Sequence, residues 1–210
     1  MAEMSMNKAI HGAFRRDLGR FTRALESFKP GDADRSARLA AAWTQLDDQF
    51  TRHHTGEHEI AWPALTAVGV SPELLATFDN EHDAMAAALT ETNKAFTGLE
   101  RNPEQEQIQA ARDAVRQLES VVVPHLDHEE KELEPVYFAK KDTPEIKAMG
   151  RAFGKVGPAA GGQFFAWLTD GASPDELAAI KASVPGPVLT IMSGVWGRSY
   201  RKNIASVWSS

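Results

Sequence analysis

Apolar residues recur along the first two thirds of the chain at alternating spacings of three and four. The first stripe consists of Phe14, Leu18, Phe21, Leu25 and Phe28. These spacings place side chains on one face of an α-helix, which predicts an amphipathic helix packed against neighbours. The sequence Lys-Pro-Gly-Asp at 29–32 predicts the end of this helix.

Three further stripes follow, each bounded by a start or stop signal. The second begins near Asp34 and ends at Gly69. The third follows Ser-Pro-Glu at 71–73 and the fourth follows Asn-Pro-Glu at 102–104, each combining a capping residue, a proline and an early acid. Pro124, inside the fourth helix, is expected to kink it. Four long helices with short connections predict an all-α, up-down-up-down four-helix bundle.

The last third of the chain contains more glycine and proline. Residues 155–162 predict an interrupted helical stretch, and Ser-Pro-Asp-Glu at 173–176 predicts the start of a short helix. Pro-Gly-Pro at 185–187 precedes a last helix that should end near Trp208. We therefore expect residues 1–140 to form the bundle and residues 141–210 to form a C-terminal helical extension packed on it.

Polar residues of the metal-ligating type stand on the apolar stripes. In the second helix, Phe50 is followed three residues on by His53, and Glu57 lies four residues further. A buried ionisable side chain is costly unless it is paired or bound to a metal. The six residues placed in this way are His11, His53, Glu57, His82, His125 and Glu129.

The spacing of these residues suits metal binding. A histidine and a glutamate four residues apart lie on one helix face, with Cβ atoms about 5–6 Å apart. Four histidines and two carboxylates that converge in the middle of a bundle predict a dinuclear site. Imidazole and carboxylate without thiolate favour iron among the redox metals, ahead of manganese or zinc.

Two segments have the same arrangement. The second helix reads HHTGEHEIAWPAL and the fourth reads HLDHEEKELEPVY, and in both a proline lies ten residues after the first histidine. The pattern His, His-x3-Glu, His, His-x3-Glu over residues 6–138 resembles the hemerythrin-like family, the HHE cation-binding domain. That resemblance implies a non-haem diiron centre with an oxo or hydroxo bridge. It also implies terminal histidine ligands and Glu57 and Glu129 as bridges or chelates.

The resemblance has two departures from the oxygen-carrying hemerythrins. Their third helix carries His-x3-His, whereas Ala86 follows His82 here. Their fourth helix carries His-x4-Asp, whereas this chain has His-x3-Glu. These differences argue against simple reversible oxygen transport and for an open coordination position.

The remaining candidates lie beside the stripes. His54, His58 and His128 are expected to be solvated or to support the ligands, with His54 or His58 as an alternative extra ligand. Tyr200 is expected to pack or to lie at the surface, and it could reach the site only if the last helix folds back. Glu130 is among the carboxylates near enough in sequence to orient a ligand histidine. No catalytic residue distinct from the metal ligands is expected.

Composition narrows the possible classes of function. The chain has 210 residues, no cysteine and a formal net charge of -6. The absence of cysteine excludes thiolate metal sites, iron–sulfur clusters and disulfide scaffolds. The acidic balance disfavours nucleic-acid binding. Without a signal-like N-terminus or a long apolar run, we expect a soluble cytoplasmic protein with no membrane partner, monomeric or weakly dimeric.

The leading hypothesis is a diiron protein that binds or reacts with O2, NO or H2O2 in bacterial oxidative or nitrosative stress handling, with an unknown electron donor. The open position favours peroxide or nitric oxide, and enzymatic turnover is left undecided. The alternative is an iron or oxygen sensor, or a metal-binding protein without turnover. Metal storage or structural zinc is a third reading, which predicts a colourless protein.

Overall fold

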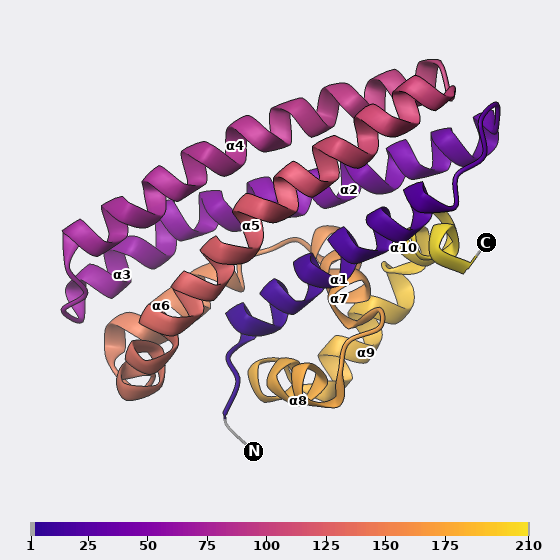
Figure 1. The fold of residues 1–210 in the computed structure, drawn as a ribbon. Coiled ribbons are helices and arrows are strands. Elements are labelled where there is room, and N and C mark those ends of the chain that lie inside the picture. The colour runs from indigo at the N-terminus through magenta and orange to yellow at the C-terminus, as the bar shows by residue number, and fades with distance from the viewer. Residues whose placement is uncertain (1–2, 210) are drawn as a thin grey trace.

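The computed structural model describes residues 3–209, whereas residues 1, 2 and 210 lie outside the described part. Within that range the chain is all-helical, as expected, and contains no strand. Four long helical segments lie side by side (Figure 1). They are α1 (Met6–Glu26), α2 (Ala33–Gly56) continued by η1 (Glu57–Ala61) and α3 (Trp62–Ala67), α4 (Pro72–Arg101) and α5 (Gln105–Lys140).

Side-chain caps explain where these segments begin. Ser5, Asp32 and Ser71 each accept a hydrogen bond from a backbone N–H three residues on, which satisfies a donor that the helix leaves free. The predicted start at 102–104 is displaced, because Asn102 ends α4 and Glu104 precedes α5 without a side-chain cap. α5 then continues unbroken through Pro124.

The core lies between the four long segments and is rich in aromatic rings. Phe14 and Phe50 stack with ring centroids 4.0 Å apart, and Trp43 and Phe96 stack at 4.9 Å. All four rings are buried. The stripe predicted from spacing in α1 is the buried face of that helix, because Phe14, Leu18 and Phe21 are fully enclosed. This packing holds the polar positions of α1 and α2 at a fixed rotation.

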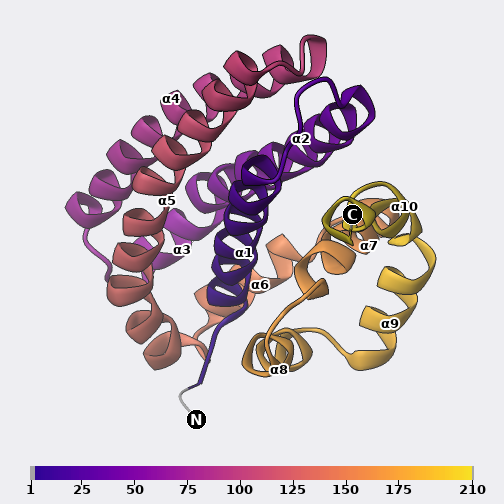
Figure 2. The ribbon, with the colours of Figure 1, turned by 45° about the vertical axis from the view of Figure 1, so that its right-hand side comes forward.

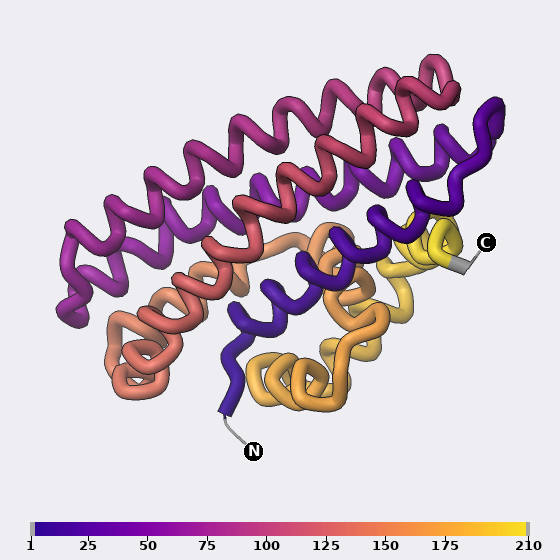
Figure 3. Tube along the Cα trace, in the orientation of Figure 1, coloured from indigo at the N-terminus to yellow at the C-terminus, as the bar shows by residue number. Residues whose placement is uncertain are grey.

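Residues 158–209 form a layer of short helices along α1, on the side away from α4, whereas residues 144–153 pack against α3 and η1 (Figures 1 and 2). The tube trace shows how the chain turns back and forth there (Figure 3). Among the described residues, no single helix has both the length and the apolarity that crossing a membrane requires. α8 and α9 pass that test only as a pair, bent by 110°. The elements are α6 (Pro144–Phe153), α7 (Pro158–Thr169), α8 (Pro174–Ser183), α9 (Gly186–Val195), α10 (Arg198–Asn203) and η2 (Ala205–Ser209).

The predicted single last helix is wrong, because three short helical pieces replace it. The break lies at Gly197, where a Cβ atom would be 2.5 Å from the Cβ of Ala166 and 2.3 Å from the carbonyl oxygen of Ser193. Only glycine allows so close an approach between α7 and the turn after α9. The predicted short helix after Ser173 is confirmed as α8, with a reciprocal capping box between Ser173 and Glu176.

Trp167 on α7 joins this C-terminal segment to α1. Its side chain is fully buried, and its indole Nε1 donates a hydrogen bond to the Oδ2 of Asp17 at 2.8 Å. Its ring lies 5.4 Å from that of Phe14. The carboxylate of Asp17 also accepts from the guanidinium groups of Arg16 and Arg20, which compensates for its burial.

A second contact extends this polar junction. Arg20 also donates to the Oδ2 of Asp170 at 3.0 Å, and the hydroxyl of Tyr200 donates to the same oxygen at 2.9 Å. Tyr200 is buried within the C-terminal segment. Its packing role agrees with the expectation from sequence.

Replacing Trp167 with alanine should lower the free energy of unfolding by about 3–5 kcal/mol, because it leaves a cavity beside Phe14 and removes a donor from buried Asp17. Urea denaturation followed by circular dichroism measures this. Trp196 is the matched control, since it is 38% exposed and its removal should cost well under half as much. Equal losses for the two variants would contradict the proposed junction.

Candidate metal centre

The site residues come from the four long helical segments. α1 supplies His11, and α4 supplies His82. α5 supplies His125 and Glu129, both buried on one face of that helix. The α2–η1 junction supplies the remaining side chains.

The α2–η1 junction departs from an ordinary α-helix. η1 is a π-helical turn, in which the backbone N–H of Trp62 bonds the carbonyl of Glu57, five residues back. Because a new α-helix starts after this turn, Pro63 falls in the first turn of α3, where its missing N–H leaves no bond unmade. The predicted uniform helix from 34 to 69 is therefore interrupted at Glu57. π turns of this kind are frequent at functional sites.

The first cluster of ligand-type atoms contains two histidines and two glutamates. The Nε2 atoms of His11 and His53 are 3.2 Å apart, and the Nε2 of His53 is 3.0 Å from the Oε1 of Glu57. The Nε2 of His11 is 3.3 Å from the Oε2 of Glu129. One ligand atom from each of these four residues lies within 4.8 Å of the others, which is the spacing that a single metal ion requires.

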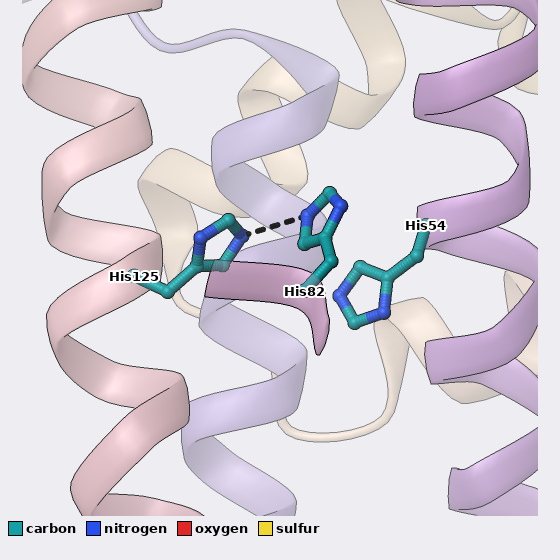
Figure 4. Close-up of side chains that lie close together, drawn as sticks. All are labelled: His54, His82 and His125. Atoms are coloured by element: carbon teal, nitrogen blue, oxygen red, sulfur yellow. Dashed lines mark hydrogen bonds between the residues drawn. The ribbon is translucent and has the colours of Figure 1, made fainter. Parts of the chain in front are cut away.

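The second cluster contains three histidines. The Nε2 atoms of His82 and His125 are 3.2 Å apart, and the ring of His54 stacks beside that of His82 with centroids 4.3 Å apart (Figure 4). Ligand nitrogens of all three lie within 4.8 Å of one another. The Nε2 of His54 is buried without a hydrogen-bond partner, so its lone pair or proton is unsatisfied.

The two glutamates connect these clusters. Glu57 places Oε1 3.0 Å from the Nε2 of His53 and Oε2 3.4 Å from the Nε2 of His82. The Oε2 of Glu129 lies 3.3 Å from the Nε2 of His11 and 3.9 Å from the Nε2 of His125. Both oxygens of Glu57 and the Oε2 of Glu129 are buried without a hydrogen-bond partner. Such atoms are costly to bury, and a cation between the clusters would satisfy them.

Carboxylates hold two of the histidines from behind. The Nδ1 of His11 is 3.2 Å from the Oε1 of Glu130, and the Nδ1 of His125 is 2.8 Å from the Oε2 of Glu81. Such contacts orient the imidazole and direct its Nε2 toward a metal. Glu130 was among the sequence candidates because it lies near His125 in sequence, but it contacts His11 of another helix. Glu81 was not a candidate, and it too contacts its histidine from a different helix. His128 shares Glu81, with its Nδ1 2.8 Å from the Oε1.

In the metal-free protein, the pKa values of the site histidines are shifted in opposite directions from the ordinary value. Burial, reinforced by neighbouring imidazoles, lowers the pKa of His53 to about 3 and of His82 to about 4. It lowers the pKa of His54 well below its usual value. Burial also opposes charge on His11, but Glu129 and Glu130 raise the pKa of that imidazole to about 9. At neutral pH most imidazoles therefore present free lone pairs, while His11 carries a proton.

The two buried carboxylates differ as well. Burial and the charge of Glu129 raise the pKa of Glu57 well above its usual value. Burial acts in the same direction on Glu129, but protonated His11 holds the pKa of Glu129 below its usual value. Two adjacent buried carboxylates cannot both ionise without a compensating cation.

The structure brings all six residues predicted from the sequence into one centre and adds His54. The position of His54 corresponds to the alternative that the sequence left open for it, because His53 and His54 stand three and four residues after Phe50 and both fall on its face. That spacing could have identified it. His58 lies outside the centre, since its side chain is 70% exposed and faces Asp79 at 3.5 Å.

Comparison with known families gives a direct result. A family model for the hemerythrin HHE cation-binding domain matches residues 5–137. This chain belongs to the hemerythrin HHE family. A search of curated proteins and a search of solved structures each found no match. The hemerythrin HHE match includes all seven residues of the two clusters, and it assigns cation binding to this part of the chain.

Metal binding to this hemerythrin HHE domain should release protons. At pH 7, about one proton should leave His11, and the raised pKa of Glu57 should add to the release, because each must be deprotonated to bind a cation. The apparent affinity should therefore rise with pH until His11 loses its extra proton in the metal-free protein, as the pH passes about 9. Calorimetric titration with Zn²⁺ in two buffers of different ionisation enthalpy counts these protons. A His58→Ala control should release the same number, and zero release would contradict the assignment.

Proposed function

We propose that the two clusters hold two iron ions, bridged by oxo or hydroxo and by the two glutamates, in an up-down-up-down four-helix domain. The main support for this proposal is that Glu57 and Glu129 each lie between an imidazole of one cluster and an imidazole of the other. Their buried oxygens have no hydrogen-bond partner, as expected for metal-bridging carboxylates. Imidazole and carboxylate donors without thiolate suit non-haem iron.

The ligand set that we propose is unequal on the two sides. His54, His82 and His125 would serve one ion, whereas His11 and His53 would serve the other. Glu57 and Glu129 would contribute to both. The two-histidine side then has one side-chain ligand fewer, which provides the position for a small exogenous ligand. His54 would thus replace the histidine that oxygen-carrying hemerythrins have at the position of Ala86. The open coordination position would then be on the ion held by His11 and His53.

The function that this arrangement supports is binding of, or reaction with, O2, NO or H2O2 in oxidative or nitrosative stress handling. An iron pair supplies one- and two-electron redox chemistry to such ligands. The protein keeps the centre dry, since Phe14, Phe50 and Phe78 are fully buried around it. Phe14 lies 5.2 Å from His53, and Phe78 lies 6.0 Å from His125. We propose that residues 1–140 perform this function and that residues 141–210 are an extension.

One observation favours the sensor alternative. Trp167 of the extension contacts Phe14 at 5.4 Å between ring centroids, and Phe14 contacts His53 at 5.2 Å. A change at His53 on metal loss would therefore reach the extension through a single intervening ring. Turnover distinguishes the two functions, because a sensor would change its structure without consuming peroxide or nitric oxide.

Elemental analysis of protein made in iron-supplemented medium should find about two irons per chain, as the two donor clusters require. Anaerobic reduction followed by rapid mixing with O2, NO and H2O2 should then change the absorption spectrum with at least one of them. Catalytic disappearance of peroxide or NO would establish an enzyme. A single zinc per chain, or no iron, would contradict the diiron function.

Substitution of single histidines tests the ligand set. His54→Ala and His125→Ala should each lose roughly half or more of the iron, because each would remove one of about three imidazoles from one ion. His58→Ala and His128→Ala should retain most of it, because these side chains are 70% and 33% exposed and lie outside both clusters. Equal loss from His128→Ala would contradict the assignment, as would full retention by His54→Ala.

A further inference from the structure

Asn7 lies one helical turn before His11 and faces the same centre. Its side-chain Nδ2 is 3.1 Å from the Oε1 of Glu129 and 3.3 Å from the Nε2 of His11. The side chain is partly buried. Within residues 3–209, these two atoms are the hydrogen-bonding neighbours of that nitrogen. No sequence motif singled out this residue, although its spacing of four from His11 places it on the ligand face.

The side-chain amide of Asn7 has two N–H donors, but its surroundings offer only one atom that can accept from them. One N–H is satisfied by the Oε1 of Glu129. The other faces the Nε2 of His11, which has a single lone pair. In the loaded protein that lone pair would bind the metal, so it cannot accept from Asn7. The second N–H is therefore available to an acceptor that the protein itself does not supply.

Among residues 3–209, no side-chain amide lies within hydrogen-bond distance of the imidazoles of the other cluster. Behind its histidines lie carboxylates, with Glu81 2.8 Å from His125 and Asp79 4.0 Å from His82. Glu81 and Asp79 are hydrogen-bond acceptors, as is Glu130 behind His11, so the two sides differ in the amide N–H of Asn7 and not in their carboxylates. A small ligand with lone pairs is consequently favoured on the side of His11 and His53, where the free N–H lies.

Resting on the diiron centre proposed above, we infer that Asn7 donates a hydrogen bond to the small ligand bound on the two-histidine side. Asn7 is thus a ligand-binding residue. It favours anions that accept hydrogen bonds, such as azide or peroxide-like and superoxide-like anions, over ligands that are poor hydrogen-bond acceptors. Its contact with Glu129 has a second effect. It fixes Oε1 and leaves Oε2 directed at the imidazoles, so the amide stays in place when the ligand leaves.

The test uses azide as the probe and the full-length, oxidised, iron-loaded protein. Absorption titration gives the azide dissociation constant, normalised to the iron content of each variant. Asn7→Leu, which keeps the size of the side chain but has no donor, should bind azide about tenfold more weakly, as expected for one hydrogen bond to a charged acceptor. Asn7→Ala should give a similar loss, and both variants should keep about two irons per chain.

Asn93→Leu is the matched control. Its Nδ2 donates to the Oδ2 of Asp47 at 3.1 Å, the same chemistry and distance as the contact between Asn7 and Glu129, in residues outside both clusters. This variant should bind azide as the unmodified protein does. An equal weakening in Asn93→Leu would show a general loss of packing and would overturn the inference.

The remaining outcomes distinguish failure of this inference from failure of the proposed diiron function. Unchanged azide affinity in both Asn7 variants, with iron retained, overturns the inference and leaves the diiron function intact. Loss of iron from both variants also overturns it, because Asn7 would then serve Glu129 and the metal instead of the ligand. Fewer than two irons in the unmodified protein, measured before azide is added, contradicts the proposed function and removes this inference with it.

Discussion

Two glutamates buried among imidazoles impose the main physical constraint on this protein. Taking a carboxylate out of water costs several kcal/mol unless a compensating charge lies beside it. Glu57 and Glu129 are both buried, and without a cation the charge of one raises the pKa of the other. Among its neighbours, protonated His11 contributes most to keeping Glu129 charged in the metal-free chain. The centre is therefore built at a cost that a positive ion would offset, and this explains why the surrounding helices must hold it rigidly.

The helices provide that rigidity by tight packing around the ligands. Stacked Phe14 and Phe50 fill the space next to His53, so the imidazoles cannot rotate freely. The π turn at Glu57 interrupts the helix regularity at the residue that faces both clusters. Glu81 and Glu130 then orient individual rings from behind. Packing and outer hydrogen bonds together hold the donors in place before any ion arrives.

The C-terminal segment extends the same core beyond the four long helices. Trp167 inserts between the polar side chain of Asp17 and the ring of Phe14, so it is joined to α1 by both a hydrogen bond and an aromatic contact. Arg20 and Tyr200 converge on Asp170 at the edge of this junction. The segment thereby covers the face of α1 opposite to α5, on the same helix that carries His11 and Asn7.

The sequence by itself determined what depends on neighbours along the chain. The stripes of the four long helices, the caps at Ser71 and Ser173, and the pairs His53–Glu57 and His125–Glu129 follow from local sequence, because a helix face repeats every three or four residues. Only the tertiary structure decided the contacts between helices. It decided that His54 joins His82, that Glu81 orients His125 and that Asn7 reaches Glu129, 122 residues away. These depend on how each helix is rotated about its axis, which the packing of distant aromatic side chains sets and local periodicity does not encode.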